Sequence, residues 1–166
     1  MIVERTLVLL KPDAIKRSIT GEIIQRFERV GLKIVGMKML MPDERLYRQH
    51  YEDIGQMISR HSEQIFKQNV DYMMSGPIIA MVLEGVEAQT LVRKMVGSTE
   101  PKSAEMGTIR GDYCHMSYEY SHANGIGIPN LVHASGSLEE AEQEIKLWFH
   151  RDELYDYVNL NEAYIR

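Results

Sequence analysis

Four runs of apolar residues predict four β-strands, at residues 6–10, 33–41, 78–83 and 126–134. Short runs rich in Val, Ile, Leu and Met are typical of strands buried in a sheet. Pro12 lacks the amide hydrogen that a ladder requires, so the first strand is expected to end at Lys11. The hydrophobic pattern therefore predicts a β-sheet whose first strand is central and buried.

Between these strands, apolar residues recur at helical spacing. Ile23, Ile24, Phe27 and Val30 share one face of a helix that Thr20 can cap. Helices are also expected at residues 42–51, 60–74 and 86–96, because apolar positions there lie near one face or follow a helix-starting residue.

The last predicted helix follows the fourth strand and begins with a capping-box sequence. In Ser137-Leu-Glu-Glu140, the hydroxyl can accept from the amide three residues on, and Glu140 can reach back. By contrast, residues 97–125 show little apolar periodicity. An irregular stretch of this length inside a compact domain is usually functional.

The order of these elements predicts the fold class. We expect an α/β sandwich of the α+β type with the ferredoxin-like βαββαβ order, in which helices cover a four-stranded antiparallel sheet. The 166-residue chain contains no repeat, low-complexity tract or linker. Residues 1–166 are therefore expected to form a single domain.

Composition limits the partners and the compartment. The formal net charge of −5 argues against a nucleic-acid partner, which requires a basic face. The single cysteine, Cys114, excludes an internal disulfide and fits a reducing compartment. The apolar run near the N-terminus is too short for a signal sequence or a membrane span. We therefore expect a cytoplasmic enzyme or binding protein that has no membrane partner.

Several polar residues lie beside predicted breaks, and as a set they suggest chemistry on phosphate. Guanidinium groups match phosphate oxygens, and a lysine adds a point charge. A neutral imidazole is a competent nucleophile near pH 7, since its reference pKa is about 6.5. Together these groups favour phosphoryl transfer through a phosphohistidine. The set comprises Lys11, Tyr51, Arg93, Thr99, Arg110, Asn130 and His133.

Each of these residues also has a simpler interpretation. Arg93 could be a solvated helix charge, Lys11 a strand-end charge, and Thr99 a turn residue. A single histidine such as His133 is more often structural than catalytic. Arg110 is a stronger candidate, because glycines on both sides allow the backbone to approach a ligand. Spacing alone does not decide between these interpretations.

Longer motifs favour the chemical interpretation. Gly107-Thr-Ile-Arg-Gly-Asp112 precedes Asn130-Leu-Val-His-Ala-Ser135, and shorter matches include Lys11-Pro-Asp-Ala14, His50-Tyr51 and Ser75-Gly-Pro77. With these motifs the chain resembles the nucleoside diphosphate kinases nearly end to end. The resemblance implies transfer of the terminal phosphate of a nucleoside triphosphate, such as ATP, to a nucleoside diphosphate. It also implies a ping-pong mechanism through a phosphohistidine.

The resemblance assigns roles to individual residues. His133 would be the nucleophile and become a pros-phosphohistidine, and Ser135 and Glu144 match residues that orient it. Mg²⁺ would be carried by the nucleotide phosphates rather than by protein ligands. A homo-oligomer, a hexamer or tetramer, is implied. The phosphates would be held by Lys11, Tyr51, Arg93, Thr99 and Arg110, and Lys11 with Asn130 would also meet the sugar hydroxyls.

Two segments, near residues 52–65 and 115–129, are longer than in the family. Counting back from Ser75 puts Ile65 at the position of the family's base-stacking aromatic residue, with Phe66 beside it. Phe66 either takes over the stacking role or packs in the core. The second segment alternates polar and aromatic residues at 115–122, and could be a hairpin arm that reaches a neighbouring subunit or covers the cleft.

A third departure is Gly136, which stands where the family commonly has aspartate. The change removes a carboxylate near the nucleophile but leaves the histidine, so we expect activity to be retained. The alternative is a nucleotide-binding regulatory module with reduced turnover, which the altered base platform and Gly136 would suggest. That alternative predicts nucleotide binding without phosphate exchange.

Overall fold

A four-stranded antiparallel sheet forms the centre of the computed structural model, which describes residues 3–160 and 162–165. The strands are β1 (Val3–Leu10), β2 (Lys33–Leu40), β3 (Ile78–Val86) and β4 (Val132–Ala134), in the order β2-β3-β1-β4. β1 is interior and pairs with β3 on one side and β4 on the other. The predicted sheet is confirmed, whereas the single domain over residues 1–166 stays a prediction.

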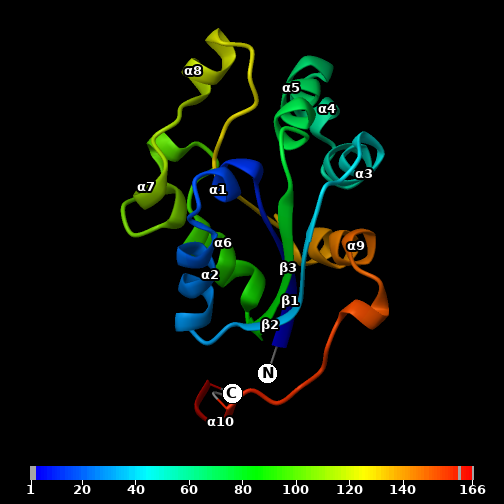
Figure 1. Ribbon diagram of the computed structural model, residues 1–166, viewed down its shortest axis with the longest axis vertical. Helices are drawn as coiled ribbons and strands as arrows, with labels where there is room; N and C mark the ends of the chain where they lie inside the picture. The colour runs from blue at the N-terminus through cyan, green and yellow to red at the C-terminus, as the bar shows by residue number, and fades with distance from the viewer. Residues whose placement is uncertain (1–2, 161, 166) are drawn as a thin grey trace.

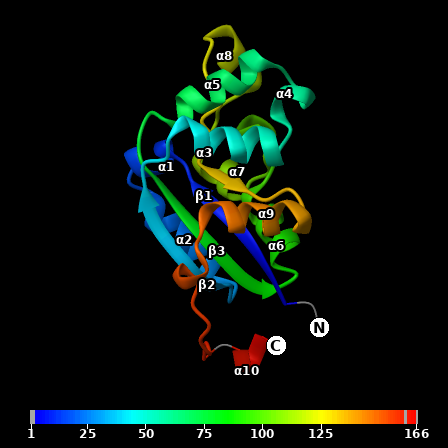
Figure 2. The same cartoon turned by 90° about the vertical axis from the view of Figure 1, so that its right-hand side faces the viewer.

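Helices cover both faces of this sheet (Figures 1 and 2). None of those in the described ranges is both long and apolar enough to cross a membrane. One face carries α1 (Pro12–Lys16), α2 (Thr20–Arg29), α6 (Ala88–Val96) and α7 (Ile109–Tyr113). The other carries α3 (Glu44–Arg48), the π-helix η1 (Gln49–Ile54), α4 (Met57–Arg60), α5 (Glu63–Met73) and α9 (Leu138–Trp148). The remaining elements are η2 (Pro101–Ser103), α8 (Tyr118–Ala123), η3 (Arg151–Glu153) and α10 (Glu162–Ile165).

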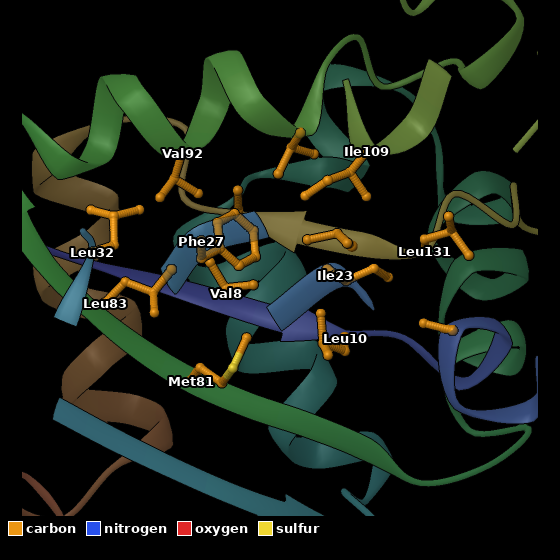
Figure 3. Close-up of a cluster of buried hydrophobic side chains, with 14 of the residues drawn as sticks. Val8, Leu10, Ile23, Phe27, Leu32, Met81, Leu83, Val92, Ile109 and Leu131 are labelled. Atoms are coloured by element: carbon orange, nitrogen blue, oxygen red, sulfur yellow. The ribbon is translucent and has the colours of Figure 1, made fainter. Parts of the chain in front are cut away.

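The side chains of β1 divide the core into two clusters. Val8 and Leu10 pack with Phe27 and other residues of α2, α6 and α7 (Figure 3). Leu7 and Leu9 pack on the opposite face, against α3, α5 and α9. Successive strand residues point to opposite faces, so a strand that is covered on both faces must be apolar throughout. This requirement explains the continuous apolar run at residues 6–10.

The fourth strand is shorter than predicted, because residues 126–131 form a loop. Pro129 has no amide hydrogen to donate, and Leu131 adopts a positive φ of 70°. The Leu131 carbonyl accepts from the Lys11 amide at 2.8 Å, and the Val132 amide donates to the Asn130 carbonyl at 2.8 Å. The sharp turn therefore fastens Asn130 next to the end of β1.

The structure corrects two further predictions about local structure. The helix expected at residues 60–74 is present as α5 but begins only at Glu63, because Ser62 caps it by accepting from the Ile65 amide at 3.2 Å. Residues 115–122 do not form a hairpin arm but lead into α8, which Ser117 caps. The expected irregular stretch at 97–125 consequently contains η2, α7 and α8.

Replacing Gly111 in α7 with alanine should destabilise the protein, although this substitution ordinarily stabilises a helix. An ideal Cβ at Gly111 would lie 2.0 Å from the Glu105 carbonyl oxygen. Gly111→Ala should therefore lower the free energy of unfolding by about 1–3 kcal/mol, although alanine is otherwise the better helix former. Gly21→Ala in α2 is the matched control, since nothing lies within 4 Å of its Cβ position. Equal effects of the two substitutions in urea denaturation would contradict this account.

Candidate active site

A cleft of about 720 Å³ lies beside the end of β4. Its walls come from segments that are far apart in the sequence, namely the end of β1, η1, α5, α6, α7, α8 and α9. Apart from Phe66 and Ser135, every residue predicted to act at the site lines this cleft. These residues are Lys11, Tyr51, Ile65, Arg93, Thr99, Arg110, Asn130, His133 and Glu144.

His133 is held by a chain of hydrogen bonds that begins at the backbone of β1. Its Nε2 lies 2.9 Å from Glu144 Oε1, and the Ser135 hydroxyl donates to Glu144 Oε2 at 2.6 Å. The Leu7 amide donates to Ser135 Oγ at 3.2 Å. An ionised carboxylate can only accept, so the imidazole proton lies on Nε2. Nδ1 therefore keeps a free lone pair.

Glu144 remains ionised although it is 2% exposed. Burial raises its pKa, but His133, His50 and the Ser135 hydrogen bond together outweigh burial and lower the pKa of Glu144 to about 2. The group that orients His133 is therefore a carboxylate at neutral pH.

His50 was missing from the predicted site, although it precedes Tyr51. Its ring meets that of His133 edge to face, with centroids 4.4 Å apart and an interplanar angle of 79°. The Trp148 indole donates to His50 Nδ1 at 3.1 Å. Burial, followed by the influence of His133, lowers the pKa of His50 to about 3. His50 is thus a neutral ring that packs against the nucleophile, a role that only the fold reveals.

Arg110 is a cation fixed by backbone carbonyls. It is 3% exposed and donates to the carbonyls of Asn130, Gly97 and Val132 at 3.1, 3.0 and 2.5 Å. Burial, and then the charge of Arg93, lowers the pKa of Arg110 to about 10. The guanidinium is therefore charged at neutral pH and already oriented.

Lys11 adds a second buried positive group at the same cleft. It is 5% exposed, and burial followed by repulsion from Arg110 lowers its pKa to about 7. Arg93 and Thr99 lie on the exposed rim, and Arg93 donates to the Ala134 carbonyl at 3.5 Å. Positive groups therefore converge around His133, as a site for a polyanion requires.

The base-platform prediction is corrected for Phe66. Its side chain is 2% exposed and packs in the core cluster with Val70 and Met73, so it does not line the cleft. The Arg48 guanidinium lies 4.8 Å from its ring centroid. Ile65 does line the cleft. The core-packing alternative therefore describes Phe66.

Gly136 leaves space that a nearby carboxylate fills. Glu140 Oε2 accepts from the Gly136 amide at 3.0 Å, and a Cβ on Gly136 would lie 2.6 Å from the same oxygen. Arg60 Nη2 lies 3.7 Å from Glu140 Oε1. The predicted capping box is consequently half formed, because Ser137 accepts from the Glu140 amide at 3.1 Å while Glu140 bonds Gly136 instead. A carboxylate therefore persists at the cleft despite the glycine.

One group of described residues brings three possible metal-ligand atoms within 4.8 Å of one another: His50, His133 and Glu144. Mg²⁺ prefers oxygen ligands, whereas this group offers two imidazoles and one carboxylate. His50 Nδ1 and His133 Nε2 already make hydrogen bonds, with Trp148 and Glu144 respectively. The group therefore suits support of the nucleophile better than magnesium binding.

Comparison with known proteins decides the family. Residues 4–154 match the family model described as Nucleoside diphosphate kinase. The chain belongs to the nucleoside diphosphate kinase family. A nucleoside diphosphate kinase of Borreliella burgdorferi is 43% identical over 159 residues, which cover 95% of this chain and 93% of that protein. One of Pyrococcus abyssi is 49% identical over 164 residues, covering 98% and 94%.

Solved structures of nucleoside diphosphate kinases have the same fold. The Borrelia burgdorferi enzyme, described as a transition state mimic with bound vanadate and ADP, matches with a TM-score of 0.94 and 41% identity, covering 98% of this chain and 96% of that chain. A Halobacterium salinarum enzyme in complex with CDP matches with a TM-score of 0.84 and 36% identity, covering 99% of both. The predicted family, phosphotransferase class and fold are confirmed, and the enzyme is favoured over the regulatory module.

Glu144→Gln should reduce phosphoryl transfer by roughly 10²–10⁴-fold, the range typical of a misplaced imidazole proton. The side-chain amide of the glutamine can donate to His133 Nε2, which allows the imidazole proton to move to Nδ1.

The stability of the wild-type protein should also depend on pH through Glu144. The pKa of Glu144 is about 2 in the fold and ordinarily about 4.3, so the carboxylate's contribution is full above the ordinary value and lost as pH falls toward 2. In urea denaturation between pH 6 and 2, the free energy of unfolding should fall more steeply with pH in the wild type than in Glu144→Gln. Parallel curves for the two proteins would contradict the assignment of Glu144 as a buried carboxylate.

Lys11 should make nucleotide affinity depend on pH. The ammonium is charged below its pKa of about 7 and neutral above it, so KM for a diphosphate should rise as pH increases through that value. Phosphate itself titrates near pH 6, so Lys11→Arg serves as the control that keeps its charge. The difference between the two KM profiles from pH 6 to 9 isolates Lys11, and identical profiles would disprove the effect.

Proposed function

We propose that the chain transfers the terminal phosphate of a nucleoside triphosphate, such as ATP, to a nucleoside diphosphate through a phosphohistidine at His133. The observation that carries this proposal is the 2.9 Å contact between His133 Nε2 and Glu144 Oε1. It leaves Nδ1 as the nucleophile in a cleft that Lys11, Arg93 and Arg110 also line. The family match supports the same reaction.

The proposed reaction has two half-reactions. Nδ1 attacks the terminal phosphorus, the N–P bond forms, and the P–O bond to the departing diphosphate breaks. Nδ1 carries no proton, so none has to leave, and Glu144 stabilises the positive charge that develops on the ring. A terminal oxygen of the second diphosphate then attacks the phosphorus. The N–P bond breaks, and its electron pair returns to the pros nitrogen.

Phosphate oxygens would be held by groups that are oriented before the substrate arrives. The backbone contacts of Arg110 and the burial of Lys11 fix these two cations, so little reorganisation is needed. The Tyr51 hydroxyl, which lies near the Asn69 side chain, and Asn130 Oδ1 are buried and make no hydrogen bond of good geometry among the described residues. They are available to a phosphate and to the sugar hydroxyls, with Arg93 and Thr99 on the rim.

The same cleft would accommodate the cofactor and the base of the nucleotide. Mg²⁺ would enter on the nucleotide phosphates and neutralise part of their charge, and no protein ligand is assigned to it. Ile65 would provide an apolar surface for the flat face of the base. This contact with the base face does not itself distinguish between bases, because every base has a flat face.

We also propose that the protein is a homo-oligomer, a hexamer or tetramer, in the cytoplasm. β2 is an edge strand, and Met37 and Met39 on it and Met41 just after it are 54%, 59% and 61% exposed. Exposed apolar side chains on an edge strand offer a surface that a second copy can cover. The single cysteine fits a reducing compartment, and the net charge of −5 fits the absence of a nucleic-acid partner.

Incubation with γ-labelled ATP tests the proposal. Label should appear on His133 as an acid-labile, base-stable adduct and should move to added GDP. His133→Ala should abolish both steps. His115→Ala is the matched control, since His115 is exposed and does not line the cleft. If His133→Ala transferred phosphate at the wild-type rate, the proposal would be wrong.

A further inference from the structure

Besides His50, two buried polar side chains with unmatched atoms line the cleft and have no part in the proposed transfer. Asn69 on α5 is 8% exposed, and its Nδ2 makes no hydrogen bond of good geometry among the described residues, while the Tyr51 hydroxyl lies near its side chain. Ser121 on α8 is 1% exposed, and its Oγ likewise lacks a partner in the described ranges. Buried polar groups are nearly always hydrogen-bonded, so two unmatched ones at a binding cleft point to a ligand that matches them.

These two residues belong to the end of the cleft that α5 and α8 form. Figure 1 shows both helices at one end of the molecule, with α9, which carries Glu144, well below them. Ile65 and Asn69 are four residues apart on α5, so they share one helical face, and both line the cleft. Tyr118 and Ser121 are three apart on α8 and also line it. This end therefore combines apolar surface with hydrogen-bonding groups.

The two walls are fastened to each other by the loop that follows α8. A Cβ on Gly127 would lie 2.7 Å from the Gln68 carbonyl oxygen and 3.0 Å from Asn69 Cα, so the loop packs directly on α5. The longer segment at residues 115–129 thereby holds Ser121 beside the same cleft as Asn69. Groups fixed in this way discriminate between ligands, because a mismatched ligand leaves them unpaired.

We propose that Asn69 and Ser121 hydrogen-bond to the edge of the nucleobase and give this enzyme a base preference. The Asn69 Nδ2 can only donate, so it favours a base with a carbonyl oxygen at that edge, as at position 6 of hypoxanthine and guanine. The Ser121 hydroxyl can donate or accept at a neighbouring atom. This inference rests on the proposed function and adds edge recognition to the contact that Ile65 makes with the base face.

Inosine diphosphate and purine riboside diphosphate provide the test, because the second lacks the carbonyl at position 6. In the wild type, kcat/KM for inosine diphosphate should be higher on the order of tenfold, the value of one well-placed neutral hydrogen bond. Asn69→Leu should bring the ratio close to one by lowering only the inosine value. Ser121→Ala should also reduce the ratio and serves if Asn69→Leu does not fold. Gln64→Leu is the matched control, since Gln64 is exposed on α5 and does not line the cleft.

Calorimetric binding of the same two diphosphates makes the test independent of turnover. A wild-type protein that binds both but transfers phosphate to neither would contradict the proposed function, while its affinity ratio would still test base recognition. A wild-type ratio near one would overturn the inference. If Asn69→Leu weakened the binding of both diphosphates equally, the inference would also be overturned, because Asn69 would then act on the sugar or through the neighbouring cleft wall.

Discussion

The buried carboxylate of Glu144 is the group on which the rest of the site depends. A charge that is 2% exposed is stable only when it is paired and hydrogen-bonded, and its partners are His133 on the short strand β4 and Ser135 directly after that strand. Ser135 is in turn bonded by the Leu7 amide of β1. The pairing of β1 with β4 therefore determines which nitrogen of His133 carries the proton. A slip of one residue would turn His133 to the other face of the sheet.

On the positive side of the cleft, the buried charged groups are cations. Lys11 and Arg110 are buried near each other, and burial and mutual repulsion lower the pKa of Lys11. Arg110 bonds three backbone carbonyls, which accept hydrogen bonds but carry no full negative charge. A bound polyphosphate would supply the missing charge and relieve the repulsion. The fold thus maintains an arrangement of cations that becomes favourable when substrate is present.

The periodicity of the sequence was sufficient for the sheet and most helices, since strands covered on both faces must be apolar and surface helices must be amphipathic. It failed at β4, where Pro129 and the positive φ of Leu131 prevent pairing in a segment that is nevertheless apolar. At residues 60–74 it gave the helix but not its start, which Ser62 fixes, and it failed at residues 115–122, because Ser117 starts a helix that was not expected there.

Nearly all of the site residues that the motifs identified line the cleft, but the motifs did not give the contacts that depend on tertiary structure. Ile65 and Phe66 are adjacent, and the helical rotation of α5 alone directs one to the cleft and the other to the core. The edge-to-face contact of His50 with His133 also requires elements distant in sequence to be placed in space, whereas the bond between the Gly136 amide and Glu140 spans only four residues.

The most direct test of the central claim is to find which nitrogen of His133 is phosphorylated. Protein labelled with ¹⁵N in its histidines would be phosphorylated with ATP, and the ³¹P–¹⁵N coupling would be assigned by NMR. The Glu144 contact predicts that phosphorus is bonded to Nδ1 of His133, with the proton retained on Nε2. Phosphorus on Nε2, or on a different histidine, would contradict the account.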